Sequence, residues 1–192
     1  HYKMPVFELI LDSLAVTGPM ALIAMIFALV ISLPLGIYAA RHQNQPGDVT
    51  VMFGTQLGLA TPEFWFGILL TLLFSVKLGW FSAGGFPGWS TDFWGSFKAL
   101  LLPAFALGVI RASILTRLTR SSMLEVLRED YVRTARAKGL KERTVVYVHA
   151  LRNALVPVLT IMGLQLGQLL AGAIIIENVY FLPGLGRLVF NA

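Results

Sequence analysis

The sequence contains no cysteine and few charged residues, and each scarcity excludes a class of protein. Without cysteine the chain has no disulfide framework, no thiolate metal site and no cysteine nucleophile. Charged residues make up 13% of the chain and hydrophobic residues 56%, whereas an ordinary soluble domain is about 25% charged and about 45–50% apolar. This composition indicates a membrane protein.

Other missing patterns argue against an enzyme or a nucleic-acid binder. The three histidines, His1, His42 and His149, lack the spacing of metal ligands. No G-x-x-x-x-G-K-[ST] phosphate-binding loop occurs, so any ATPase must be a partner. The net charge of +5 does not form a basic stripe interleaved with stacking aromatics. We therefore expect no catalytic residue, no metal, no cofactor and no nucleic-acid partner.

Four apolar stretches are long enough to cross a bilayer. A helix that rises 1.5 Å per residue needs about 20 residues to cross about 30 Å of hydrocarbon. Because unpaired backbone groups are not tolerated in lipid, these stretches must be helices. The sequence therefore predicts an all-α, polytopic membrane helix bundle that forms a single domain over residues 1–192. The predicted spans are residues 13–40, 49–76, 99–116 and 153–176.

The distribution of Lys and Arg predicts the orientation of the chain. Most basic residues lie in the segment 117–152, and Arg41 lies in the short link 41–48. The other connections contain only Lys3, Lys77, Lys98 and Arg187. Cytoplasmic loops carry the excess of Lys and Arg. We therefore predict that 41–48 and 117–152 are cytoplasmic and that 77–98 and 177–192 are external.

Polar residues inside the predicted spans are candidates for a translocation path. Thr61-Pro62-Glu63 interrupts the second span, with Thr61 as cap, Pro62 as first residue and Glu63 in the first turn of a restarting helix. A charge in the bilayer costs about 2.5–3.5 kcal/mol, so Glu63 should face protein or a water-filled path. It either caps the helix or contacts cargo. Gln165 and Gln168 share a helix face and either line the path or form interhelical hydrogen bonds.

Two further patterns concern packing and the external loop. The pairs Gly54/Gly58 and Gly163/Gly167 place glycines four residues apart, which lets another helix approach closely. The external connection 77–98 is rich in Trp and Phe. These rings anchor helix ends at the lipid headgroups, or they form a docking surface for an external partner.

The cytoplasmic segment predicts a helix, a break and a second short helix. The third span continues through Met123, Leu124 and Leu127, and a short helix over 132–138 ends at Gly139, which is suited to a left-handed cap. From Lys141 a further helix returns to the membrane. A short helix outside the bilayer suits contact with another protein.

Specific motifs in this segment resemble those of a known family. The run Tyr131-Val-Arg-Thr-Ala-Arg-Ala-Lys-Gly139-Leu, followed by His149-Ala-Leu-Arg-Asn-Ala-Leu-Val-Pro157, resembles the signature loop of bacterial binding-protein-dependent ABC import permeases, and most closely their dipeptide/oligopeptide/nickel branch. Arg133-Thr134-Ala135 stands where the general motif has Glu-Ala-Ala, so the acidic contact of other branches is not implied. Supporting matches are Pro34-Leu-Gly36, Leu78-Gly-Trp80, Arg120-Ser-Ser-Met-Leu124 and Pro183-Gly-Leu-Gly186.

The resemblance implies a type I ABC importer permease fold in the bacterial cytoplasmic (inner) membrane, crossing it several times. It also implies a fragment that lacks the family's first and last helices. The expected partners are a related but different second permease subunit, two cytoplasmic ATP-binding subunits and an external solute-binding protein. Such a chain forms the path for peptides or a similar small solute and is not itself an enzyme. Its implied ATPase-coupling residues are Arg133, Thr134, Ala135, Arg136, Ala137, Lys138, Gly139 and Leu140.

One alternative remains open on the residues alone. An ion-coupled secondary transporter would use an intramembrane acid such as Glu63 as its proton or cation site. The sequence has no second repeat half or partner base to accompany it. The motifs do not choose among dipeptides, oligopeptides, nickel complexes, glutathione and sugars as cargo.

Overall fold

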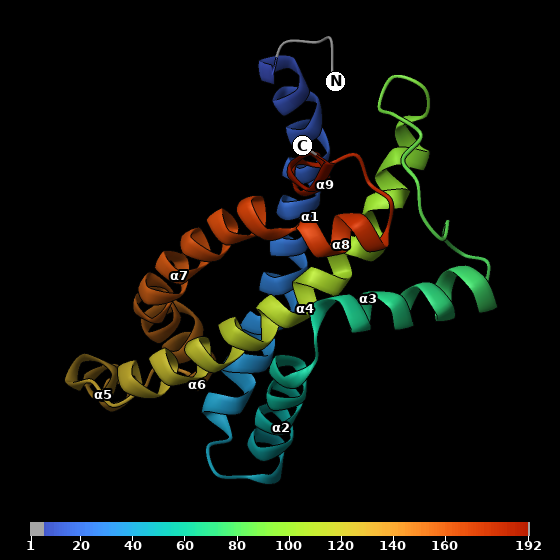
Figure 1. Cartoon of the computed structure of the whole chain (residues 1–192). Coiled ribbons are helices and arrows are strands. Elements are labelled where there is room, and N and C mark those ends of the chain that lie inside the picture. The colour runs from blue at the N-terminus through green and yellow to red at the C-terminus, as the bar shows by residue number, and fades with distance from the viewer. Residues whose placement is uncertain (1–5, 192) are drawn as a thin grey trace. The chain divides into compact units, whose positions relative to one another are not determined.

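The computed structural model describes residues 6–191, and every regular element in this range is a helix (Figure 1). The all-α prediction is therefore confirmed. Lys3 and the last residue of the predicted external segment 177–192 lie outside the described residues. The elements are α1 (Val6–Arg41), α2 (Pro46–Ala60), α3 (Glu63–Leu70), the π-helix η1 (Thr71–Lys77), α4 (Phe93–Val126), α5 (Asp130–Ala137), α6 (Glu142–Thr144), the π-helix η2 (Val145–Ala150), α7 (Leu151–Gly172), α8 (Ile174–Val179) and α9 (Leu185–Asn191).

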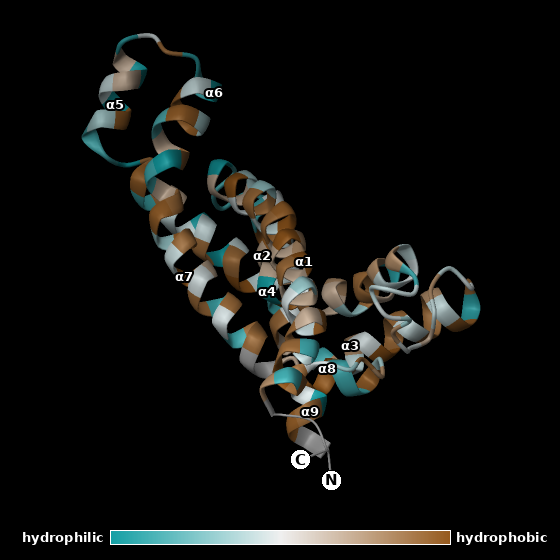
Figure 2. Cartoon of the chain, turned by 90° about the horizontal axis from the view of Figure 1, so that it is seen from above, coloured by the Kyte–Doolittle hydropathy of each residue, from teal (hydrophilic) through white to brown (hydrophobic). Residues whose placement is uncertain are grey.

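Three helical stretches are long and apolar enough to cross a membrane: Phe7–Arg41, Phe93–Val126 and Glu142–Leu170. The pair formed by α2 and the helix Glu63–Lys77 is a fourth crossing only if the bent pair counts as one span. Helices α1 and α4 extend beyond the predicted apolar stretches at both ends, because helical hydrogen bonding continues into their polar ends. The predicted stretch 153–176 is instead interrupted, since α7 ends at Gly172 and α8 begins at Ile174. Figure 2 shows the apolar character of these helices beside the more hydrophilic connections around α5 and α6.

The second predicted span is broken at Thr61-Pro62. Helix α2 ends at Ala60 and α3 begins at Glu63, with Pro62 as the N-cap residue. The break is as predicted, but the assignment of Thr61 as cap and Pro62 as the first helical residue is wrong by one position. The reason is the extended backbone of Pro62, whose ψ is 132°, so the helical geometry starts only at Glu63.

The chain divides into two compact units, and the first comprises residues 1–27, 61–110 and 165–192. Its helices approach closely at small residues. Phe27 packs edge-to-face on Phe105 with ring centroids 5.6 Å apart. A Cβ atom on Gly108 would lie 2.8 Å from the carbonyl oxygen of Ala24, so only glycine allows this approach. The Tyr180 hydroxyl donates to the carbonyl of Gly67 over 2.9 Å. These contacts fix α1, α3, α4 and α8 within the unit.

The aromatic connection between η1 and α4 also belongs to the first unit. Trp89 donates from Nε1 to the carbonyl of Ala15 over 2.8 Å and packs against Phe86 and Phe93. Trp94, in contrast, is 75% exposed. One ring is thus fixed to α1 while another points outward, and both the anchoring and the docking interpretations stay predictions.

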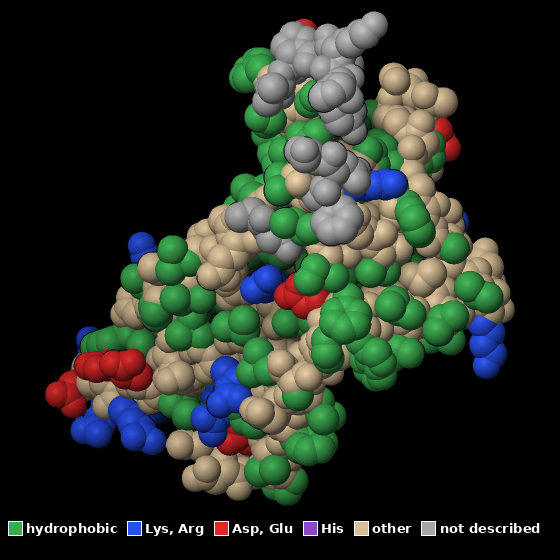
Figure 3. Space-filling view, in the orientation of Figure 1, with side chains coloured by type: hydrophobic (Ala, Val, Ile, Leu, Met, Phe, Trp, Pro, Cys, Tyr) green, Lys and Arg blue, Asp and Glu red, His purple; other side chains and the backbone are tan. Residues whose placement is uncertain are grey.

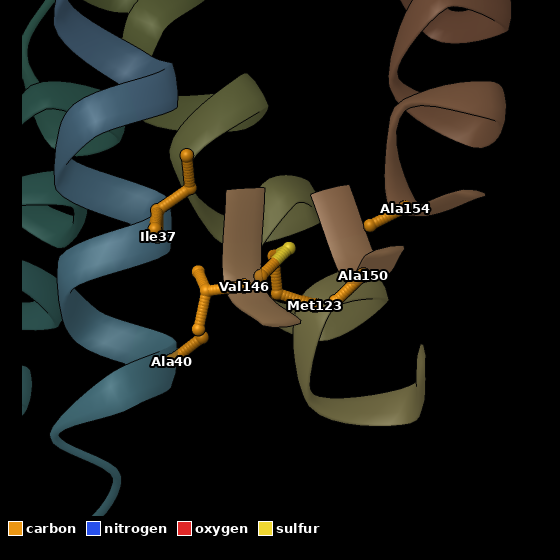
Figure 4. Close-up of a cluster of buried hydrophobic side chains, with 6 residues drawn as sticks. All are labelled: Ile37, Ala40, Met123, Val146, Ala150 and Ala154. Carbon is orange, nitrogen blue, oxygen red and sulfur yellow. The ribbon is translucent and has the colours of Figure 1, made fainter. Parts of the chain in front are cut away.

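The second unit comprises residues 28–60 and 111–164. Its main apolar cluster joins α1, α4, η2 and α7 (Figure 4). Gly58 packs against Ser113, as the small-residue pattern predicts, whereas Gly54 and Gly163 face open space. Gly167, in the first unit, is open as well. The buried members of the cluster are Ile37, Ala40, Met123, Val146, Ala150 and Ala154.

Candidate functional site

The segment 117–152 carries the predicted coupling residues, and its helices follow the sequence pattern. Helix α4 continues to Val126, α5 follows over Asp130–Ala137, and α6 begins at Glu142. The predicted continuation of the third span and the short helix beyond it are confirmed. Figure 3 shows Lys, Arg, Asp and Glu side chains gathered over α5.

Helix α5 is amphipathic, and its apolar face is anchored within the second unit. Val132 and Ala135, three residues apart on one face, are buried together with Val145 of η2. Val126 and Leu127 at the end of α4 pack against this cluster. Full burial of a valine side chain contributes about 1.5 kcal/mol or more. The short helix is therefore positioned by its contacts and not by its own propensity, which is too weak for eight residues.

The turn after α5 requires glycine. Gly139 has φ +79°, in the left-handed region that side chains other than Asn and Asp rarely adopt. Its N–H donates to the carbonyl of Arg136 over 2.9 Å, and the N–H of Leu140 donates to the carbonyl of Ala135 over 3.3 Å. This pair of bonds is a Schellman motif. The predicted left-handed cap at Gly139 is confirmed.

The predicted coupling residues are exposed with one exception. Arg133, Thr134, Arg136, Ala137, Lys138, Gly139 and Leu140 lie at the surface, whereas Ala135 is buried against Val132 and Val145. Of the two alanines in this set, Ala137 therefore lies on the outer face of the helix and Ala135 on the inner face. Leu140 is 40% exposed and supplies an apolar side chain at the tip.

The basic residues of the site differ in what they already bind. Arg136 donates two hydrogen bonds to Glu142, over 2.9 and 3.1 Å. This pairing holds the pKa of the Glu142 carboxyl below its usual range and raises the pKa of Arg136. Arg133 lies 3.3 Å from Asp130 in a fully solvated pair, and such pairs contribute about 1 kcal/mol or less. Lys138 makes no ion pair with any described residue. Arg133 and Lys138 are thus the charges best placed for a partner.

The two halves of the family-like motif are joined by a hydrogen bond. The side-chain amide of Asn153, in the first turn of α7, donates to the hydroxyl of Tyr131 in α5 over 2.7 Å. Sequence reasoning included both residues in the motif but assigned neither a role. Together with the Arg136–Glu142 pair, this bond connects α5 directly to the helices that lead into the third long apolar stretch.

The candidate path residues lie in different environments. Glu63 is half-buried at the first residue of α3. Gln165 is 3% exposed, and neither atom of its amide has a hydrogen-bond partner among the described residues. Gln168 is exposed, so the two glutamines lie in different environments although their spacing of three residues places them on one helix face. A buried amide without a partner costs about 1–3 kcal/mol, and a path role for any of the three residues stays a prediction.

Two buried acids escaped the sequence analysis. Asp48 is buried and pairs with Arg120, and Glu177 is fully buried and accepts a hydrogen bond from Thr17. The signal for Asp48 was that it is the only acidic residue in the link 41–48, which also contains Arg41. For Glu177 the available signal was indirect and lay in the motif Pro183–Gly186. The structure shows why this motif needs a glycine, since a Cβ on Gly184 would collide with the Glu177 carboxylate. Within the described side chains, no group of three His, Asp or Glu is arranged to hold a metal ion.

Long apolar helices with a short amphipathic helix between two of them are typical of a polytopic membrane protein. Residues 32–192 match the family described as the binding-protein-dependent transport system inner membrane component, and the chain belongs to this family. The resemblance noted in the motifs is thereby confirmed. The matched family is a component of binding-protein-dependent transport systems, and the match lends no support to the ion-coupled alternative.

Two curated relatives illustrate the similarity. The oligopeptide transport system permease protein AppB of Bacillus subtilis is 45% identical over 98% of this chain and 60% of its own length. The dipeptide transport system permease protein DppB of Escherichia coli is 39% identical over 99% of this chain and 63% of its own length. The chain thus spans about 60% of the length of these relatives.

A solved structure supports the fold. The crystal structure of an amino acid ABC transporter with histidines matches 97% of this chain and 78% of its own chain with a TM-score of 0.62. The sequence identity is 14%, so this likeness concerns the fold alone. The predicted helical architecture of an ABC importer permease is confirmed.

Proposed function

We propose that this chain is the membrane-spanning permease subunit of an ATP-driven peptide importer in the bacterial inner membrane. The observation that carries the proposal is the geometry of α5. Its apolar face is held by Val132 and Ala135, and its end is turned by Gly139, so the family motif is displayed on the outer face. The relatives named as oligopeptide and dipeptide permeases support peptides as cargo.

The surface Arg133–Leu140 engages a cytoplasmic ATP-binding subunit. Leu140 offers an apolar contact, and Arg133 and Lys138 offer positive charge to acidic groups on that subunit. ATP is bound there, and this chain is not itself an enzyme. Two ATP-binding subunits, a second, related permease subunit and an external solute-binding protein complete the transporter.

The bonds from α5 to α6 and α7 give the coupling a mechanical basis. A displacement of α5 by its partner must carry Glu142 and Asn153 with it, because Arg136 and Tyr131 hold them at 2.9 and 2.7 Å. Closure of the ATP-binding subunits thereby moves α7, which contributes Gln165 and Gln168 to the path. Glu63 lies on the same path and pairs with the free amine of a peptide.

A substitution series at Gly139 tests the coupling surface. In Gly139→Val a β-branched residue must adopt φ near +79°, so the turn after α5 is distorted. Gly139→Asn is the matched control, because Asn tolerates the left-handed conformation and no atom lies within 4 Å of the added Cβ. We expect the valine variant to insert normally but to lose co-purification with the ATP-binding subunit and ATP-driven uptake. The asparagine variant should retain most of both.

Two results would contradict the proposal. One is undiminished co-purification and uptake in Gly139→Val. The other is uptake in proteoliposomes that persists without ATP and stops when the ion gradient is removed. That result would favour an ion-coupled secondary transporter.

A further inference from the structure

A pocket of about 360 Å³ in the second unit has no role in the function proposed above. It lies beside the apolar cluster of Figure 4, with which it shares Ala40 at the end of α1. The last turn of α4 and the residues after it, together with α5 and α6, form the remaining walls. Four separate helices therefore meet around one cavity.

Positive charge exceeds negative charge in this pocket. Its lining includes three basic residues, Arg41, Arg128 and Arg136, and one acidic residue, Glu142. Arg136 and Glu142 are paired with each other, which leaves two guanidinium groups. Neither Arg41 nor Arg128 makes an ion pair with a described residue. Two positive charges that border one cavity both attract an anion placed between them.

The positive charge around the pocket acts on the pKa of Glu142. Hydrogen bonds from Arg136 lower the pKa of this carboxyl most, and the charges of Arg136 and Arg41 lower it further. The charge of Arg41 therefore reaches into the cavity although its side chain is exposed. An anionic ligand would experience the same attraction and would face Arg128 as well.

The rest of the lining is Gln43 and the apolar residues Ala40, Leu124 and Leu127, a mixture that fits an amphipathic ligand. Leu124 and Leu127 line the pocket and at the same time pack against the buried cluster. Arg presents a planar fork of donors that binds two phosphate oxygens at once. Basic pockets between membrane helices on the cytoplasmic side are suited to phospholipid headgroups. Such a headgroup would place its phosphate at the arginines and its glycerol and chains along the leucines.

We propose that this pocket binds a phosphate group through Arg41 and Arg128, and that the phosphate is supplied by an anionic phospholipid or by a soluble phosphate compound. The inference rests on the proposed membrane function, which places this end of α1 and α4 at the cytoplasmic interface. A ligand there bridges α1 and α4 next to the anchor of α5, so it stabilises the position of the coupling surface.

The test uses the full-length subunit with its partners in nanodiscs of phosphatidylcholine, with and without phosphatidylglycerol. Native mass spectrometry counts the phosphatidylglycerol molecules that stay bound after the protein is released from the nanodisc. Equilibrium dialysis measures the binding of radiolabelled inorganic phosphate. The pocket variant is Arg41→Gln/Arg128→Gln. The control Lys141→Gln/Arg143→Gln removes the same charge from exposed positions that do not line the pocket.

We expect the wild-type subunit to retain phosphatidylglycerol over phosphatidylcholine and the pocket variant to lose about tenfold in this retention, while the control stays near the wild type. This result identifies a lipid source. Binding of inorganic phosphate that the pocket variant alone loses also supports the site and identifies a soluble source. If the pocket variant inserts poorly, Arg41→Lys/Arg128→Lys keeps the charge without the forked donors and should retain an intermediate amount.

The proposal is overturned if the wild type shows no preference for phosphatidylglycerol and binds no inorganic phosphate. Equal loss of phosphatidylglycerol in the pocket and control variants would also overturn it, because diffuse surface charge would then explain the binding. Unchanged retention of phosphatidylglycerol in the lysine variant would overturn it as well. Lipid retention is independent of the ATP-binding subunit. A failure of the coupling surface therefore shows in the Gly139 series and not in this measurement.

Discussion

Arg120 and Asp48 form a forked ion pair in the second unit, with Nε and Nη2 of the arginine each 2.6 Å from a carboxylate oxygen. The backbone N–H of Asn44 donates to the same carboxylate over 2.9 Å. Asp48 is only 3% exposed. The hydrogen bonds from Arg120 lower the pKa of Asp48, and the same pair raises the pKa of Arg120. The link 41–48 is thereby attached to α4.

Removing one partner of this pair should destabilise the protein. Asp48→Asn leaves a partly buried guanidinium without its counter-charge, and we expect a loss of about 2–3 kcal/mol in the free energy of unfolding. The measurement is thermal unfolding in detergent, followed by tryptophan fluorescence. Arg117→Gln is the control, because Arg117 makes a single exposed hydrogen bond to Gln56 and should cost about 1 kcal/mol or less. Equal effects of the two substitutions would contradict the importance of the pair.

The same pair predicts an acid-sensitive contribution to stability. Because the pKa of Asp48 is lower in the folded protein than its unfolded value of about 3.9, the pair stabilises the fold above that value. This contribution is lost as the pH falls through the folded pKa. The stability difference between wild type and Asp48→Asn should therefore be constant near neutral pH and shrink below about pH 4. A difference that does not change between pH 7 and pH 3 would contradict this assignment.

The orientation of the chain can be tested by labelling, and the absence of cysteine gives a background-free protein. A cysteine at Ser82, which is exposed in the aromatic connection, should react from outside. A cysteine at Lys141, exposed between α5 and α6, should react only from the cytoplasm. Ser122 lies nearby but is buried and would not be reached. Reaction of Ser82→Cys and Lys141→Cys with an impermeant maleimide from the same side would exclude the predicted topology.

Local signals explain how far the sequence predicted the fold. The long apolar helices follow from hydrophobic length, and α5 follows from apolar residues three apart that end at a glycine. These features depend on neighbours within one turn of helix. The position of Pro62 was misjudged by one residue because ψ at a proline is not set by the ring, which fixes only φ.

The buried polar contacts were not predictable in the same way. Asp48 meets Arg120, and Thr17 meets Glu177, across long stretches of sequence. Which acid meets which base depends on how the helices pack, and the residue types alone allow many pairings. The same holds for Arg136, which the motif assigned to a partner but which is largely occupied by Glu142.

A substitution at Glu63 separates a path residue from a structural one. Glu63→Gln keeps the size of the side chain and removes the charge. If the carboxylate contacts the free amine of cargo, uptake of peptides with a free N-terminus should fall about tenfold or more, because a hydrogen bond to a charged group contributes about 1.5–3 kcal/mol. Uptake of N-acetylated peptides should change little. Equal uptake of both classes by the variant and the wild type would leave only a role in starting α3.

Glu177 and Thr17 connect three helices of the first unit. The Thr17 hydroxyl donates to Oε1 of Glu177 over 2.5 Å and accepts from the N–H of Leu185 over 2.9 Å. The second carboxylate oxygen accepts from the N–H groups of Gly186 and Arg187, over 2.7 and 3.2 Å. One carboxylate from α8 thus binds α1 and satisfies the first amides of α9, which have no partner within their own helix.

This arrangement predicts that Glu177→Gln is destabilising even though it preserves shape. Every contact to Glu177 comes from a donor, so an amide must turn its NH₂ group toward a hydroxyl or a backbone N–H. We expect a loss of about 2 kcal/mol in the free energy of unfolding, measured by tryptophan fluorescence. Thr17→Val removes only the hydroxyl and should cost less, about 1–2 kcal/mol, because the Leu185 amide then lacks its acceptor. Thr17→Ser retains the hydroxyl and is the matched control. If the valine variant is as stable as the serine variant and the wild type, the hydrogen bonds through the Thr17 hydroxyl contribute nothing, and the role given to Glu177 fails.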